Sequence, residues 1–310
     1  MRVLRGSCVL KPLPIVLKAV PDELLSSWLR RHARFYGVTE AGLIDWLGLG
    51  VLALRTLDHQ LGLGQVARLS QALYCDPKTL VEMTHTPLPA EARPLVRQGR
   101  AVLVCRSCAA RHRAGDAEGA VLKSWIEAWR ITCRLCARPL SETGSLRGNA
   151  DTLRKTSIFG EQWWHLALEG EGIVECHIRG SVTPLSSQLA LMRLLLLPSW
   201  YRPEQPFAGF YSGWLLNELV PGFDARARLI KRRVNQGAIG SIPPDLRVAL
   251  LAGIALVAAD PTAVIDHLRP ACRLFYQRRF EELAAAVSNQ ITPSQIDSRC
   301  ENMRRPLSHD

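Results

Sequence analysis

Two C-x-x-C pairs constrain this chain more than any other feature. Cys105 and Cys108 form the first pair and Cys133 and Cys136 form the second, with residues 109–132 between them. Zinc prefers four thiolate or imidazole ligands in a tetrahedron, and two such pairs supply a complete set. Because four thiolates leave no coordination position for water, the pattern predicts one structural Zn²⁺ bound by these four cysteines.

Three alternatives for this segment stay open at the level of sequence, and the first is that the four cysteines are buried without a metal ion. His112 lies four residues after Cys108 and could replace one thiolate, although its polar surroundings favour a surface position. A C-x-x-C pair without metal is typical of a thiol redox enzyme. Two pairs in one short segment nevertheless favour metal binding over redox chemistry.

Size and charge narrow the class of protein. At about 150 residues per domain, a chain of 310 residues is expected to form more than one unit. Hydrophobic residues make up 47% and charged residues 22%, which excludes wholesale disorder. The formal net charge of +11 favours an anionic partner, most often nucleic acid. No apolar run reaches the about 20 residues that a membrane span requires, and no secretion signal is recognisable, so we expect a cytoplasmic protein without a membrane partner.

The spacing of apolar residues predicts a mainly α-helical protein in three parts. Residues 1–97 form a helical region with helix-turn-helix spacing, residues 98–145 an inserted zinc-ribbon module, and residues 146–310 a helical C-terminal domain. The module is distinct because the short β-like runs VLVC and RITC each end in a cysteine pair. A short helix around Trp125 to Trp129 is expected between the two pairs.

The N-terminal region opens with a predicted helix over residues 21–37. Pro21, Asp22 and Glu23 suit a first helical turn, and Gly37 suits a helix end. The residues expected to face the core are spaced three and four apart: Leu24, Leu25, Trp28, Leu29, His32 and Phe35. The opposite face carries three arginines that we expect to be exposed and to contact nucleic acid or a protein partner: Arg30, Arg31 and Arg34.

Further helices are predicted over residues 40–49 and 65–73 and from Pro77 onward. The last two have the spacing of a helix-turn-helix motif, but the second carries Lys78 and Glu82 and no arginine, which does not favour base-specific contacts. A second basic run is a better candidate for contact with phosphate, with a solvated helix face as the alternative: Arg226, Arg228, Lys231, Arg232 and Arg233.

Sequence signatures of enzymes are missing. The chain has no nucleotide-binding G-x-x-x-x-G-K-[ST] loop, no G-x-S-x-G nucleophile elbow and no H-E-x-x-H metalloprotease motif. Its glycine-rich stretch LGLG lies between predicted helices, without the preceding strand of a dinucleotide-binding fold. We therefore do not expect the chain to be an enzyme.

The order of motifs along the chain resembles the TniQ family of transposition proteins. The resemblance begins at the helix PDELLSSWLRRHARFYGV, continues through KSWIEAWRITC and reaches the late helix that ends in a D-x-P-like motif. The matching positions are Trp28, Cys105, Cys108, Trp125, Trp129, Cys133, Asp260 and Pro261. One position departs, because TniQ proteins usually end the zinc motif in C-x-x-H and Cys136 stands where the histidine would be. Cysteine is an equally good zinc ligand, so the metal is still expected.

The resemblance implies a non-catalytic, target-selecting adaptor of a multi-protein DNA transposon. Such proteins reach target DNA directly or through a guide-RNA effector complex, and they recruit an AAA+ transposition ATPase that brings the DDE transposase. The sequence leaves open whether the chain forms a homodimer. The rival interpretation is a zinc-ribbon transcription regulator that binds a specific DNA operator, which would require a basic recognition helix that residues 77–85 do not offer.

Overall fold

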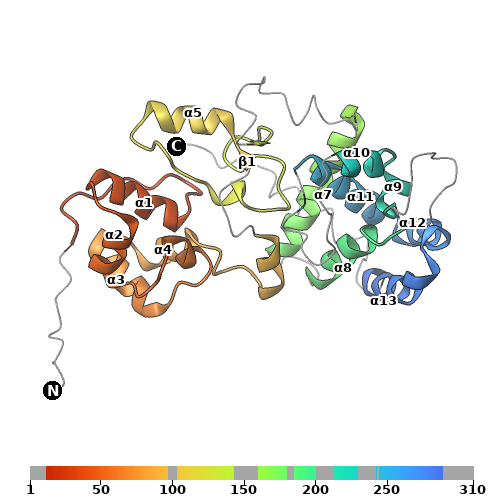
Figure 1. Cartoon of the computed structure of the whole chain (residues 1–310), viewed down its shortest axis with the longest axis horizontal. Helices are drawn as coiled ribbons and strands as arrows, with labels where there is room; N and C mark the ends of the chain where they lie inside the picture. Colours follow the sequence, from red (N-terminus) through yellow and green to blue (C-terminus); the bar gives the residue numbers. More distant parts are fainter. Residues whose placement is uncertain are drawn as a thin grey trace, which may run out of the picture. The chain divides into compact units, whose positions relative to one another are not determined.

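The computed structural model is mainly α-helical (Figure 1). It describes residues 12–96, 103–142, 160–179, 185–199, 213–229, 242 and 244–288. Within these ranges the named strands are β1 (Leu103–Val104) and β2 (Ser141–Glu142). The predicted fold class, helical with a zinc-ribbon-like element, is confirmed.

The chain folds as two compact units. The first consists of the residues up to Leu88 together with Ser107–Ser124, and the second consists of Pro89–Arg106 together with the chain from Trp125 onward. Part of the segment between the two cysteine pairs thus packs with the N-terminal helices. The predicted division into residues 1–97, 98–145 and 146–310 stays a prediction.

The α-helices of the first unit up to Leu88 follow the predicted periodicity, and one 3₁₀ helix that was not predicted lies between them. They are α1 (Leu25–Phe35), α2 (Glu40–Leu47), the 3₁₀ helix η1 (Leu54–Asp58), α3 (Leu63–Leu73) and α4 (Pro77–Glu82). Thr39 and Asp76 cap α2 and α4, because their side-chain oxygens accept hydrogen bonds from the backbone N–H groups of Gly42 (3.0 Å) and Thr79 (3.1 Å). These caps fix where the two helices begin.

The first helix begins later than the sequence predicts. Asp22 has a left-handed backbone conformation (φ 63°), and Glu23 forms an antiparallel bridge with Leu122, so neither residue lies in a first helical turn. The expectation that the acidic pair starts the helix was therefore wrong. The chain makes this turn because residues 120–124 of the same unit pair with it, and α1 begins at Leu25.

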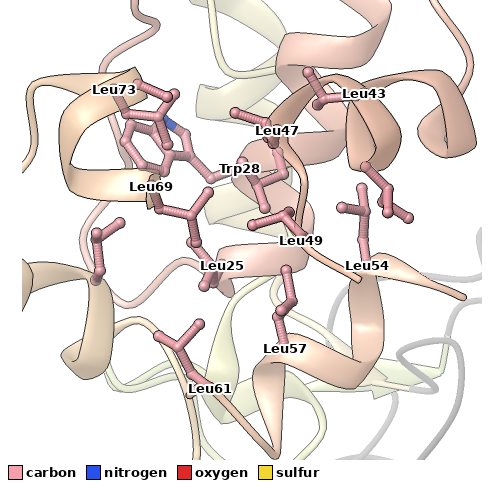
Figure 2. Close-up of a cluster of buried hydrophobic side chains, with 14 of the residues drawn as sticks. Leu25, Trp28, Leu43, Leu47, Leu49, Leu54, Leu57, Leu61, Leu69 and Leu73 are labelled. Carbon is pink, nitrogen blue, oxygen red and sulfur yellow. The ribbon is translucent and has the colours of Figure 1, made fainter. Parts of the chain in front are cut away.

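Leucine side chains fill the core of the first unit around Trp28 (Figure 2). The Trp28 side chain is 2% exposed, and its indole N–H donates to the carbonyl oxygen of Leu17 (2.8 Å), so the ring buries its one polar atom with a partner. Leu24, Leu25, Leu29 and His32 are buried as predicted. Phe35 is 51% exposed, which corrects the prediction that it faces the core, because it is the last residue of α1.

A buried carboxylate, Asp58, satisfies the N-terminus of α1. Its oxygens accept hydrogen bonds from the backbone N–H (2.9 Å) and the hydroxyl (2.5 Å) of Ser26. Burial raises the pKa of the Asp58 carboxyl to about 6. His85 contacts the same residue, because its backbone N–H donates to the carbonyl oxygen of Asp58 (2.6 Å). Burial lowers the pKa of the His85 imidazole to about 3.

The second unit contains one short helix before β1 and the helices that follow β2. They are η2 (Ala90–Leu95), α7 (Gly160–Ile178), α8 (Leu185–Leu195), α9 (Leu216–Leu219), α10 (Phe223–Leu229), α11 (Pro244–Ala259), α12 (Pro261–Leu268), η5 (Arg269–Ala271), η6 (Leu274–Tyr276) and α13 (Gln277–Ser288). Helices α7 and α11 approach closely at Gly170, where an added Cβ would lie 1.9 Å from the carbonyl oxygen of Leu251. Glycine is required at this position because the two backbones leave no room for a side chain.

Apolar helices are common in this unit, but none has the length and hydropathy of a single membrane span among the described residues. One pair, Leu246–Ala259 and Pro261–Ala271, meets those criteria only when taken together, and it is bent by 119°.

Candidate metal centre

The four paired cysteines converge on one point. Their sulfur atoms all lie within 4.8 Å of one another, and the Sγ atoms of Cys105 and Cys136 are 3.4 Å apart. A Zn–S bond of about 2.3 Å places the sulfurs of a tetrahedral site about 3.8 Å apart, so the spacing fits one zinc ion. Cys105, Cys108 and Cys133 are buried and Cys136 is partly exposed. The donor set suits a closed structural site that the protein itself completes.

The first cysteine pair lies where a strand meets a helix. Strand β1 ends directly before Cys105, and helix α5 (Arg106–Ala114) carries Cys108 in its first turn. β1 pairs antiparallel with β2, with Val104 opposite Ser141. The Arg111 guanidinium donates to the Cys108 sulfur (3.2 Å), and both this cation and the helix N-terminus favour a thiolate.

The second pair lies on a tight turn. The Cys133 backbone N–H donates to the carbonyl oxygen of Arg138, and the Ala137 N–H donates to that of Cys133, both at 2.8 Å. Ala137 takes a left-handed conformation (φ 53°) to close this turn. The RITC run forms only a single bridge, Thr132 with Pro139, and the partner of β1 is β2. The prediction of two β-like runs is thus confirmed for the first run only.

The short helix predicted between the pairs does not form where it was expected. Its 3₁₀ helix η3 covers Lys123–Trp125, and the chain continues to Trp129 as turns and a bridge. This corrects the expectation of a helix over Trp125 to Trp129. Both tryptophans are nonetheless almost completely buried, at 3% and 2% exposure.

His112 is not a member of the sulfur cluster. The group of side chains close enough to share an ion consists of the four cysteines, and His112 lies further along α5, half-buried. Burial lowers the pKa of its imidazole. The alternative in which His112 replaces a cysteine is therefore not supported by the geometry.

A buried acid on α7, Glu171, contacts the chain just before Cys133. Its carboxylate accepts hydrogen bonds from the backbone N–H groups of Ile131 (3.1 Å) and Thr132 (3.2 Å) and from the Thr132 hydroxyl (2.7 Å). Glu171 was not among the residues predicted from the sequence. The available signal was the four-residue spacing of Glu171 and Glu175, which places two acids on one side of a helix that also carries apolar residues.

The three arginines predicted to line one exposed face of α1 have different environments. Arg34 is exposed, and Arg30 is partly exposed and pairs with Glu40 (2.7 Å). Arg31 is only 5% exposed and forms an ion pair with Glu23, which corrects the expectation that it faces solvent. The physical reason is the left-handed turn at Asp22, which brings the Glu23 carboxylate within hydrogen-bond distance of the Arg31 guanidinium.

The second basic run is only partly described. Arg226 and Arg228 lie on α10 and are half-buried, while Lys231, Arg232 and Arg233 lie outside the described residues. The helix-turn-helix spacing of α3 and α4 is confirmed as two helices and a turn. The second helix, however, ends at Glu82 after six residues, which is short for a helix that reads a DNA groove.

We compared the sequence with models of known protein families. The TniQ family model matches residues 14–165. Over these residues the chain belongs to the TniQ family. The TniQ region thus takes in α1 to α4 and all four cysteines, and it ends inside α7. No curated protein and no solved structure matches the chain.

Membership of the TniQ family gives the chain a role associated with transposition, as an accessory component of a transposition complex. The resemblance predicted from Asp260 and Pro261 lies beyond the matched residues and stays a prediction. In the structure these two residues end one helix and begin the next, because the Asp260 carboxylate accepts from the Ala263 backbone N–H (3.0 Å) and caps α12.

Proposed function

We propose that this chain is a non-catalytic, target-selecting adaptor of a DNA transposon. In this proposal it links target DNA, or a guide-RNA effector complex bound to it, to an AAA+ transposition ATPase. The TniQ match is the observation that carries the proposal, because it covers the N-terminal helices and the whole cysteine cluster. As the DNA it acts on is chromosomal or plasmid DNA, we expect the chain in the cytoplasm.

The chemistry of the metal centre supports a scaffolding role. Bound zinc would hold together residues from β1, α5 and the turn at Cys133–Cys136, and four thiolates would leave it no position for a substrate. Rigid elements of this kind present a fixed surface to a partner, which is what an adaptor requires.

The charge of the chain supports an anionic partner. With a formal net charge of +11, we expect weak, sequence-tolerant and strongly salt-dependent binding to duplex DNA, with dissociation constants of roughly 10⁻⁴ to 10⁻⁶ M at physiological salt. The contact residues proposed from the sequence remain Arg30, Arg34, Arg226, Arg228, Lys231, Arg232 and Arg233, with Arg31 withdrawn because it is buried in an ion pair.

The rival function, a zinc-ribbon transcription regulator, has less support. Its recognition helix would be α4, which has six residues and whose Lys78 pairs loosely with Glu82 (3.9 Å). A regulator reads base edges with several side chains of such a helix, and each good contact discriminates by about 1–3 kcal/mol. α4 offers one cation for this task.

Co-purification distinguishes the two functions. The full chain is mixed with labelled duplex DNA and with a candidate AAA+ transposition ATPase, and complexes are separated by size with their masses measured. The adaptor proposal expects the chain and the ATPase to elute together, and the mass also reports whether the chain is a homodimer. Tight binding to one operator sequence without association of the ATPase would favour the regulator.

A further inference from the structure

Helix α7 contacts the chain segment that leads into the second cysteine pair. We propose that Glu171 is a positioning residue for this centre, and that its carboxylate fixes the backbone that delivers Cys133 to the metal. The inference rests on the four-cysteine metal site and not on the role in transposition.

The contacts of Glu171 are directed at the backbone that leads into the ligand. One carboxylate oxygen accepts from the N–H groups of both Ile131 and Thr132, and the other accepts from the Thr132 hydroxyl. Thr132 directly precedes Cys133 in the chain. Three hydrogen bonds on two consecutive residues restrict the backbone conformation of this segment. The position of the next residue, Cys133, is restricted as a result. Groups that orient a ligand in this way raise metal affinity without touching the metal.

The charge of Glu171 is compensated inside the protein. The Arg130 guanidinium pairs with Glu171 (3.1 Å), Glu127 (2.7 Å) and Glu175 (2.8 Å), and the side chains of Arg130 and Glu171 are 9% and 7% exposed. Burial alone lowers the pKa of Arg130, but the three carboxylates outweigh it and raise that pKa above its ordinary value. Loss of one member of such a buried network leaves an uncompensated charge in the interior, which is strongly destabilising.

A second contact holds the same segment on α7. The indole N–H of Trp129 donates to the Glu175 carboxylate (2.7 Å), one helical turn after Glu171. Residues 129–132 therefore lie along the face of α7 that carries Glu171 and Glu175. Because Gly170, beside Glu171, packs directly on the α11 backbone at Leu251, the position of α7 is itself fixed by the core of the second unit.

The test measures zinc retention in the full chain. Glu171→Ala removes all three hydrogen bonds, Glu171→Gln keeps the size and one acceptor oxygen, and Glu169→Gln removes the same charge from an exposed position of α7. Each protein is loaded with zinc and challenged with a chromogenic chelator. We expect zinc affinity to fall about 10–100-fold for Glu171→Ala, by a smaller factor for Glu171→Gln and not at all for Glu169→Gln.

A spectroscopic measurement separates positioning from loss of the fold. Co²⁺ replaces zinc, and its d–d absorption reports the tetrahedral geometry of the sulfurs, while circular dichroism reports the helices. We expect Glu171→Gln to keep its helicity while its Co²⁺ spectrum shifts and its metal is released faster. If Glu171→Ala does not fold, Glu171→Gln alone decides the question.

Two results would overturn the inference. The first is that Glu171→Gln, and Glu171→Ala if it folds, retain zinc as well as the unmodified chain does. The second is that Glu169→Gln loses as much zinc affinity as the Glu171 variants, which would mean that the charge of the helix causes the effect. If the unmodified chain binds no zinc, the proposed metal site itself is wrong. None of these outcomes tests the association with the ATPase, so failure of this inference is distinct from failure of the proposed function.

Discussion

The carboxylate of Glu23 and the guanidinium of Arg31 form a two-point ion pair in the interior of the first unit. Both Nε and Nη2 of Arg31 lie 3.0 Å from oxygens of Glu23, and the two side chains are 4% and 0% exposed. The same arginine donates to the carbonyl oxygens of Lys18 (2.7 Å) and Asp116 (3.1 Å). Arg31 therefore joins the segment before α1 to the segment after α5.

Removing one member of this pair is expected to be costly. Arg31→Ala leaves the Glu23 carboxylate buried without its cation, and we expect a loss of about 3–5 kcal/mol in the free energy of unfolding by urea denaturation. Arg30→Ala serves as the control, because its pair with Glu40 is partly exposed and is worth less than about 1 kcal/mol. Equal effects of the two substitutions would show that the buried pair has no special role.

Metal analysis tests the four-cysteine site. Protein purified without chelator should contain about one zinc per chain, and Cys133→Ser should lose it and change the fluorescence of Trp125 and Trp129, which are buried and lie between the two cysteine pairs in the sequence. Cys75→Ser is the matched control, since Cys75 is a free, half-buried thiol outside the cluster. A folded chain without metal, or the same zinc content in both variants, would contradict the assignment.

Two arginines of α1, the partly exposed Arg30 and the exposed Arg34, provide a test of partner contact. Arg30→Glu combined with Arg34→Glu should slow association with the ATPase while the fold and zinc content stay unchanged, because charges at the rim of an interface mainly steer encounter. The control is Arg55→Glu combined with Lys78→Glu, which makes the same change of charge at other exposed positions. If the α1 variant associates with the ATPase as fast as the unmodified chain does, this face of α1 is only solvated helix surface.

The carboxyl group of Asp58 predicts a dependence of stability on pH. Its folded-state pKa of about 6 lies above its ordinary value of 3.8, so the folded protein favours the protonated form and stability is lost as the pH rises through 6. Asp58→Asn should accept the Ser26 N–H without this dependence. Relative to that variant, the unmodified chain should gain up to roughly 3 kcal/mol between pH 7.5 and 4.

The measurement is urea denaturation of both proteins at several pH values. His85 stays neutral in the folded state until about pH 3, and it contributes equally to both proteins, so the difference isolates Asp58. Asp45→Asn, at an exposed position of α2, should show no such trend. A constant difference between Asp58→Asn and the unmodified chain would mean that Asp58 stays ionised in the core.

Local patterns predicted most of the helices and the convergence of the four cysteines. The periodicity of Leu25, Trp28 and Leu29 gave α1, and the spacing of the cysteines gave the sulfur cluster, because both patterns act within a few residues or within one motif. Arg31 escaped prediction because its partner Glu23 lies outside the helix and reaches it only through the left-handed turn at Asp22. Glu171 escaped because its partners lie some 40 residues earlier in the chain. Periodicity does not encode contacts of that range.

Helix α7 also bears on how such proteins can change during evolution. The residues that match the TniQ family end at 165, but α7 continues to Ile178 and carries Glu171 beyond that point. A gene fusion or recombination that exchanged everything after residue 165 would cut this helix and separate the second cysteine pair from its support. An exchange of C-terminal parts between relatives that spares the metal centre must therefore place its junction after the end of α7.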